Sequence, residues 1–292
     1  QSGADGFGGV SVRGGDIDQN LFLLDGVPVY NVTHGAGIFS IYNSSAIRSA
    51  QLLKGGFPAQ YGGRISSVWD IQTKEGNSNQ MQGELDLGLT SGKLTLEGPL
   101  KKEKGSFFVT GRRAFFDFYS IPFTTRLRRN EGVDGYTGYF FYDLNAKINY
   151  QVSQKDRVYL SFYRGKDDYQ DVYEQSRISN DTVIFVADNE QVGWGNDISA
   201  LRWNHQFSDR LFGNLLATYS RYYYNSEDFV DLEILDSTRQ ALRNVLLFKY
   251  DSEVKDQSVK ADFDFATRQN HFLRFGLSAT RHRFQPGVLH FS

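Results

Sequence analysis

Long segments of the chain alternate apolar and polar residues one by one. From Asn145 to Val152, apolar side chains occupy every second position, and Asn, Lys and Gln side chains occupy the positions between them. The same period recurs at 259–265 and 273–280, and with smaller residues at 211–219. Because successive side chains of a strand point to opposite faces, each segment is predicted as a β-strand with one apolar and one polar face.

The connections between these strands differ in length. Short polar turns are predicted at Lys101–Gly105, Ser153–Asp156, Ser208–Arg210 and Arg268–Asn270, and long loops at about 120–137, 170–195 and 228–256. This asymmetry is typical of an outer-membrane β-barrel, which has brief periplasmic turns and longer extracellular loops. A soluble β-sandwich shows no such systematic difference.

Aromatic residues gather at the predicted long-loop ends of the strands. The clusters are Phe115, Phe116, Phe118 and Tyr119; Tyr139, Phe140, Phe141 and Tyr142; and Tyr222, Tyr223 and Tyr224. An interfacial girdle is expected there in a membrane barrel, and a sandwich core rich in Tyr and Phe is the alternative. The sequence has no apolar run near the ~20 residues that a membrane-spanning helix needs.

The predicted barrel does not close by itself. About nine strands follow Gly83, an odd number, and an open sheet edge in lipid leaves unpaired backbone groups. Roughly 75 residues of glycine-rich sequence precede the strands, and only barrels of about 22 strands have room for such a plug. We therefore expect residues 1–77 to form a plug and residues 78–292 the first part of a barrel that further sequence or another chain completes.

Several motifs in order resemble the plug domain of TonB-dependent outer-membrane transporters. They are Val12-Arg-Gly-Gly15, Leu24-Asp-Gly-Val-Pro-Val-Tyr-Asn31, Ala46-Ile-Arg-Ser49 and Lys54-Gly-Gly-Phe-Pro-Ala-Gln-Tyr-Gly-Gly-Arg64. The segments Lys93–Leu100 and Ser106–Arg113 are similar to the first barrel strands of that family. The resemblance implies an all-β-dominated fold: a small α+β plug followed by antiparallel transmembrane strands of a barrel of about 22 strands.

The resemblance also implies a function and partners. A member of this family imports a scarce nutrient of the siderophore, haem, glycan or peptide class across the outer membrane of a Gram-negative bacterium. Its partners would be the TonB–ExbB–ExbD energy complex, reached through a segment before Gln1, and outer-membrane lipid and lipopolysaccharide. A surface lipoprotein lid or other outer-membrane proteins are further candidate partners. The alternative is a transporter-like barrel that serves as a structural or assembly subunit without transport.

The stretch from Val12 to Tyr30 was considered as a ligand site. Asp16, Asp18 and Asn20 have calcium-loop spacing, but the sixth and twelfth positions lack the required glycine and glutamate. No phosphate-binding glycine motif opens a helix here. We expect the glycines to shape the backbone, residues 21–24 to form a buried strand, and Asp25-Gly26 to reverse it.

Two arginines in the plug motifs are candidates for a latch. In the family, plug arginines pair with carboxylates on the inner barrel wall, which would place Arg13 and Arg64 opposite Asp143, Asp262 or Asp264, or opposite acids on later strands. Hydrogen bonds from both arginines to plug carbonyls are the equally weighted alternative.

The loop from Tyr30 to Asn43 is the candidate cargo-binding segment. It carries Tyr30, His34, Phe39 and Tyr42 beside flexible glycines, and by resemblance such loops reach the extracellular side of the plug. A packed, structural loop is the alternative for each residue.

Catalytic, metal and cofactor sites are not predicted. The five histidines are scattered, cysteine is absent, and no nucleophile elbow occurs. The net charge of −2 gives no indication of nucleic-acid binding. The acidic pair Asp167-Asp168 is expected to be solvated, and Arg281, His282 and Arg283 are expected near the outer rim, either solvated or against lipopolysaccharide phosphates.

Overall fold

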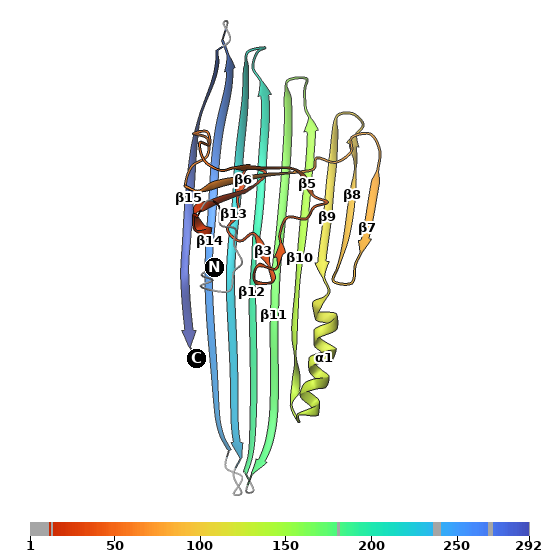
Figure 1. Cartoon of the computed structure of the whole chain (residues 1–292), viewed down its shortest axis with the longest axis vertical. Coiled ribbons are helices and arrows are strands. Elements are labelled where there is room, and N and C mark those ends of the chain that lie inside the picture. Colours follow the sequence, from red (N-terminus) through yellow and green to blue (C-terminus); the bar gives the residue numbers. More distant parts are fainter. Residues whose placement is uncertain (1–11, 13, 180–181, 236–240, 268–270, 292) are drawn as a thin grey trace.

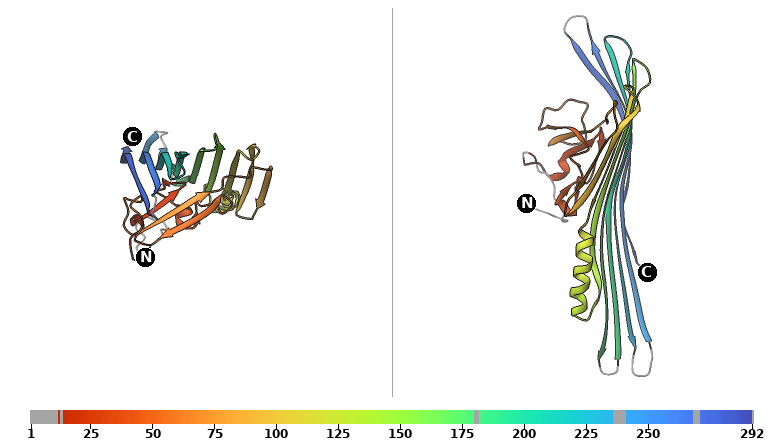
Figure 2. Two further views of the ribbon diagram at one scale, coloured as in Figure 1. Left: turned by 90° about the horizontal axis from the view of Figure 1, so that it is seen from above. Right: turned by 90° about the vertical axis from the view of Figure 1, so that its right-hand side faces the viewer.

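The computed structural model describes residue 12 and residues 14–179, 182–235, 241–267 and 271–291. The plug lies against one face of a tall curved sheet, which we call the wall (Figures 1 and 2). The elements of the plug are η1 (Ile17–Gln19), β1 (Asn20–Leu24), β2 (Val27–Pro28), β3 (Thr33–His34), η2 (Gly35–Gly37), β4 (Phe39–Ser40), β5 (Ile47–Leu53) and β6 (Ser67–Thr73). Its main sheet has the order β2-β1-β6-β5, in which β1 and β6 are parallel.

The glycines of the first motif have the structural role predicted for them. Gly14 has φ +75°, and a Cβ on Gly15 would lie 2.5 Å from Ser66 Oγ, so the chain turns and packs where side chains would not fit. Asp25 and Gly26 both have positive φ, 52° and 86°, as a type I′ hairpin turn requires between β1 and β2.

The wall is one antiparallel sheet of nine strands in sequence order among the described residues. Its strands are β7 (Gln82–Leu87), β8 (Ser91–Lys101), β9 (Gly105–Ala114), β10 (Asp134–Gln151), β11 (Asp156–Ser179), β12 (Thr182–Gln206), β13 (Leu211–Leu235), β14 (Ala241–Ala266) and β15 (Phe272–Phe291). The predicted fold class is confirmed. Three of the short turns are also confirmed, and 268–270 lies outside the described residues.

The predicted long loops are wrong. Residues 170–195 and 228–256 extend the hairpins β11–β12 and β13–β14, and residues 120–137 hold the helix α1 (Phe116–Asn130) and the start of β10. The strand signal is weak in these segments because apolar and polar side chains do not alternate there, as in the apolar run Val183–Val186. We call this side of the wall the hairpin end and the opposite side the turn end.

The wall reverses the polarity of a soluble sheet. Asn145, Lys147 and Asn149 of β10 point at the plug and are 0–6% exposed, whereas Ile148 on the opposite face is 43% exposed. The strand register extends the outward row of Ile148 across β11–β15 through Leu160, Leu201, Ala217, Val259 and Ala279. A polar inner face and an apolar outer face are typical of a membrane barrel. Within the described residues, no helix has the length and apolarity to cross a membrane.

Helix α1 covers an edge of β10 that β9 leaves unpaired. The ladder between these strands ends at Tyr142, and the Thr137 amide beyond it donates to Thr124 Oγ1 at 2.9 Å. Arg128 donates to the Tyr136 carbonyl at 3.2 Å. Satisfying these backbone groups removes an exposed edge that would otherwise pair with another chain.

Candidate functional site: the interface between plug and wall

The first anchor between plug and wall is a buried histidine between two aspartates. His34 Nδ1 lies 2.6 Å from Asp167 Oδ2, and His34 Nε2 lies 2.8 Å from Asp143 Oδ1. All three residues are at most 2% exposed. Because ionised carboxylates only accept hydrogen bonds, both ring nitrogens must donate, and His34 is therefore an imidazolium.

Neighbouring groups complete the first anchor. Arg112 of β9 donates through Nε to Asp143 at 2.7 Å and through Nη2 to the plug carbonyl of Ser40 at 2.7 Å. The Gly35 amide donates to Asp167 at 2.9 Å, and Phe141 stacks on the imidazole with ring centroids 4.3 Å apart. Burial alone would lower the pKa of His34, but its hydrogen bonds to the two carboxylates and their charges raise it to about 9.

The second anchor has the opposite polarity, with the acid on the plug. Asp25, in the β1–β2 turn, accepts from Lys147 Nζ of β10 at 2.8 Å and from the Thr73 amide at 3.1 Å. Asp25 is 4% exposed and Lys147 is 6% exposed. Removing one partner of a pair this deeply buried leaves an uncompensated charge, which typically costs about 3–5 kcal/mol.

Wall side chains also bind the plug backbone directly. Asn196 Nδ2 donates to the Asn31 carbonyl at 2.8 Å, and Ser220 Oγ donates to the Pro28 carbonyl at 2.7 Å. Between these contacts lies a shared apolar core. Its buried members are Phe22, Leu24, Val27, Val29, Ile41 and Ile71 from the plug and Tyr163, Ile198, Ala200 and Leu216 from the wall.

The predicted cargo-binding residues contact the wall. Tyr30 donates to Asp256 Oδ2 at 2.5 Å, and burial followed by this bond raises the pKa of its phenol. Phe39 packs against Phe116 of α1 with ring centroids 5.5 Å apart. Tyr42 packs against the shared core, and burial raises its pKa. Together with His34 in the first anchor, these side chains hold the loop in place, and contact with cargo stays a prediction.

Of the two predicted latch arginines, the structure describes Arg64. Arg13 is outside the described residues, and Arg64 is exposed and donates to the neighbouring carbonyl of Gly63 at 2.9 Å. Of the three proposed partners, Asp143 pairs with Arg112 and His34. Asp262 lies 3.4 Å from Lys260, and Asp264 lies 2.7 Å from Arg274. The plug cation that binds a predicted wall carboxylate is thus His34, which the sequence predicts as a cargo-binding residue.

The remaining predictions for polar residues concern an acidic pair, a segment with calcium-loop spacing and a histidine of β15. The expectation that Asp167-Asp168 is solvated is wrong, because these residues are 1% and 4% exposed. In the segment with calcium-loop spacing, Asn20 Nδ2 donates to the Asp16 carbonyl, and Ser67 Oγ donates to Asn20 Oδ1. His282 contacts Asp256 at 2.7 Å.

Beyond the anchors, toward the hairpin end, the inward face of the wall is aromatic. The register aligns Phe141, Asp167, Trp194 and Tyr224 in one inward row, and Tyr139, Tyr169, Val192, Ser226 and Tyr250 in the next row. The Tyr139 hydroxyl donates to Asp167 at 2.5 Å, which joins the second row to the first anchor. Sequence reasoning had assigned part of these aromatics to a lipid-facing girdle.

Comparison with known proteins identifies the N-terminal domain. Residues 1–68 match the family model described as TonB-dependent Receptor Plug Domain. No curated protein matches the chain. The chain therefore contains a plug domain of the TonB-dependent receptor type, and the resemblance predicted from the sequence is confirmed.

Solved structures similar to the chain include three receptors. The siderophore receptor PirA from Acinetobacter baumannii has 14% identity and a TM-score of 0.42, over 93% of this chain and 50% of that one. A G324V mutant of the ferric enterobactin receptor PfeA from Pseudomonas aeruginosa has 14% identity and a TM-score of 0.39, over 94% and 51%. BauA, the ferric preacinetobactin receptor from Acinetobacter baumannii, has 10% identity and a TM-score of 0.35, over 91% and 53%. The chain spans about half the length of these structures.

Proposed function

We propose that this chain is the plug and part of the wall of an importer that carries a scarce nutrient across the outer membrane of a Gram-negative bacterium, driven by the TonB–ExbB–ExbD complex. The observation that carries the proposal is a TonB-dependent receptor plug seated on the polar face of a sheet whose other face is apolar. We assign transport instead of catalysis, because the buried ionised groups of both anchors bind plug to wall.

The orientation follows from the two ends of the wall. Barrels of this class have short periplasmic turns and longer extracellular connections, so the turn end faces the periplasm. The plug lies nearer the turn end, and the long hairpins extend away from it toward the bottom of the view (Figure 1). Cargo then arrives from the hairpin end and meets the aromatic rows before it meets the plug.

The aromatic rows are the surface that we assign to cargo. Rings such as Tyr169, Tyr224 and Tyr250 offer rigid flat contact area and, through their hydroxyls, hydrogen bonds, which suits siderophores, haem, sugars and peptides alike. Tyr169→Ala would weaken cargo binding and leave plug docking unchanged, because its contacts lie outside both anchors.

The outward face supports membrane insertion with a charged rim at the hairpin side. Two rows beyond Ile148, the outward positions are Leu144, Arg164, Asp197, Arg221, Lys255 and Arg283. Arg164 Nε lies 2.5 Å from Asp197, and Arg221 Nε lies 2.5 Å from Glu253. These cations are placed to meet lipopolysaccharide phosphates where the apolar band ends.

A reversible tether between plug and wall tests import. In the full-length gene product, Asn31→Cys with Asn196→Cys would place thiols on either side of a plug–wall contact, where a cleavable thiol cross-linker would link plug to wall, and these 292 residues contain no other cysteine. The matched control, Leu201→Cys with Ala217→Cys joined by the same cross-linker, links two wall strands at register partners on the outward face. Growth of a deletion strain is measured on ferric siderophores, haem, oligosaccharides and peptides as the sole iron or carbon source.

The outcomes separate the two functions. If the protein is an importer, it supports growth on one cargo, and this growth is lost with the plug tether or without TonB. Reductant restores growth of the tethered strain, and the control tether has no effect on growth. If the protein is a structural or assembly subunit, growth on each cargo is unchanged by the plug tether and by loss of TonB. That result would refute import.

A further inference from the structure

A polar cavity lies at the boundary between plug and wall, near the turn end. It has a volume of about 250 Å³ and is lined by Arg48, Ser49, Gln72, Thr73 and Glu75 from the plug side and by Lys147, Tyr159, Arg202 and Asn204 from the wall. This volume is several times that of one water molecule, so the cavity has room for a small solute and its hydration.

The cations around this cavity outnumber the carboxylates. Lys147 is paired with Asp25, and Arg48 is paired with Glu75, whose second oxygen lies 3.9 Å from Arg157. Arg202 adds a fourth cation, which leaves an excess of two positive charges.

Arg202 has no carboxylate partner among the described residues. Its Nη2 donates to the Asp25 carbonyl at 3.0 Å, and its Nε is buried without a hydrogen-bond partner in the described part of the chain. A guanidinium always carries its charge, and this one is half-buried with one N–H group withdrawn from water and no counter-ion beside it in that part of the chain, which is unfavourable. An anion in the cavity would remove that penalty.

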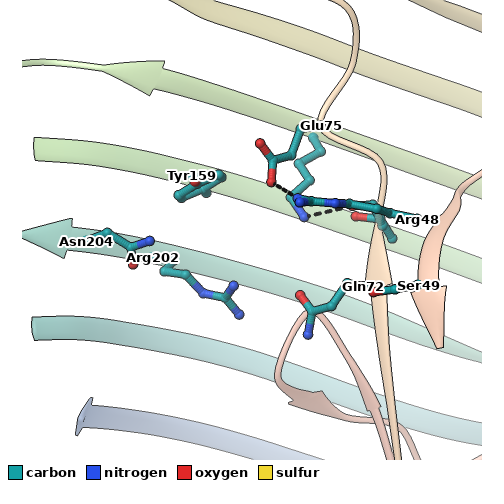
Figure 3. Close-up of a pocket in the computed structure, with 9 residues that line it drawn as sticks. Arg48, Ser49, Gln72, Glu75, Tyr159, Arg202 and Asn204 are labelled. Carbon is teal, nitrogen blue, oxygen red and sulfur yellow. Dashed lines mark hydrogen bonds and ion pairs between the residues drawn. The ribbon is translucent and has the colours of Figure 1, made fainter. Parts of the chain in front are cut away.

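The arrangement presents cations from both parts of the protein to one space. In Figure 3 the guanidinium of Arg48, on the plug, extends into the cavity toward its partner Glu75, and the guanidinium of Arg202 extends into the same cavity from the wall, with Tyr159 at its side. A planar guanidinium is suited to bind two oxygens of one oxyanion, and the Tyr159 hydroxyl adds a further donor.

We propose that this cavity binds a small oxyanion, a phosphate or a carboxylate, which bridges Arg202 of the wall to Arg48 of the plug. The site lies on the seam between plug and wall, so a bound anion adds an exchangeable contact to the two fixed anchors. The proposal depends on this geometry alone and stands whether or not the protein imports a nutrient.

The test is isothermal titration of the purified full-length protein in detergent with inorganic phosphate, and in parallel with acetate, at constant ionic strength. Saturable binding of either anion at one site is expected. Arg202→Gln should weaken it about tenfold or more, since charge-assisted hydrogen bonds are lost, and Arg202→Lys should restore part of the affinity. Arg126→Gln, which removes an exposed arginine of α1, is the matched control and should bind like the unchanged protein.

Tyr159→Phe keeps the ring and removes one donor, so it tests the site in a variant expected to retain its fold; a severalfold loss of affinity is expected. Circular dichroism of each variant establishes folding. Absence of saturable binding of both anions by the unchanged protein would overturn the proposal. Equal affinities of the Arg202→Gln and Arg126→Gln variants would do so as well.

Discussion

Replacing His34 by phenylalanine removes the charge of the first anchor and keeps a ring that can stack on Phe141. His34 is 1% exposed and donates to Asp143 and Asp167, so its loss leaves two buried carboxylates with fewer donors. Breaking a buried ion pair from one side typically costs about 3–5 kcal/mol. We expect the plug loop to open more often by the corresponding factor, at least a hundredfold.

The same anchor makes plug docking depend on pH. The pKa of His34 is raised from 6.5 to about 9 in the docked state, so the docked state binds this proton more tightly than the open one. The resulting stabilisation, about 3 kcal/mol, is fully present below pH 6.5 and is lost as the pH rises through about 9. Docking raises the pKa of His34, so its protonation stabilises the docked state and its deprotonation removes that stabilisation.

Hydrogen exchange of residues 31–43 measures this opening, because the Gly35 amide donates to Asp167 only when the loop is docked. After correction for the intrinsic pH dependence of exchange, protection should fall about a hundredfold between pH 6 and pH 9.5. The His34→Phe variant should be weakly protected at both pH values. His205→Phe is the control, since that histidine also contacts an aspartate, Asp156 at 2.6 Å, but the contact lies within the wall and the histidine side chain is 24% exposed. Protection that is independent of pH, or unchanged in His34→Phe, would refute the reasoning.

Three further predictions concern other parts of the structure. Asp25→Asn and Lys147→Met should each destabilise plug docking by about 3–5 kcal/mol, and the double variant by clearly less than their sum, as protease sensitivity of the plug would report. Ile148→Arg should cost about 2–4 kcal/mol in unfolding from lipid vesicles, because its outward row is apolar across six strands; a cost near zero would contradict a lipid-facing surface. Gly15→Ala should lower plug stability by about 1–3 kcal/mol in thermal unfolding, because its Cβ would lie 2.5 Å from Ser66 Oγ, and Ser66→Gly should recover part of the loss.

The sequence predicts the parts of this fold that have a local signal. The two-residue period of 145–152 identifies β10 and its polar face, and the dipeptide Asp25-Gly26 identifies the β1–β2 turn. The extended hairpins lack that signal because apolar and polar side chains are mixed on both of their faces, and pairing with the neighbouring strands holds them in place. Helix α1 was not predicted because Pro122 lies inside it and none of its residues is buried, so it has no apolar face packed on a core.

The anchors could be predicted only in part, because each joins residues more than a hundred positions apart. Asp143 was a candidate partner for a plug cation, and it does bind one. A lone histidine in a glycine-containing loop gives no indication that it will be a buried cation, so His34 was assigned to cargo. Lys147 lay on the predicted polar face, but nothing in the sequence pairs it with Asp25, 122 residues away.

The composition of the interface bears on how a plug can be both firmly held and removable. Hydrogen bonds from wall side chains to plug carbonyls exchange for water with a small net change in free energy, so they add little resistance once water enters. The two anchors behave differently, because a buried ion pair is close to neutral as a whole, whereas breaking it from one side is costly. A partly open state, in which a charged group of an anchor has lost its partner but is still buried away from water, is therefore the least favourable. We expect the plug to be either docked with both anchors formed or displaced with both anchors hydrated. A pull on its N-terminal side that admits water at one anchor would then also favour release of the second anchor.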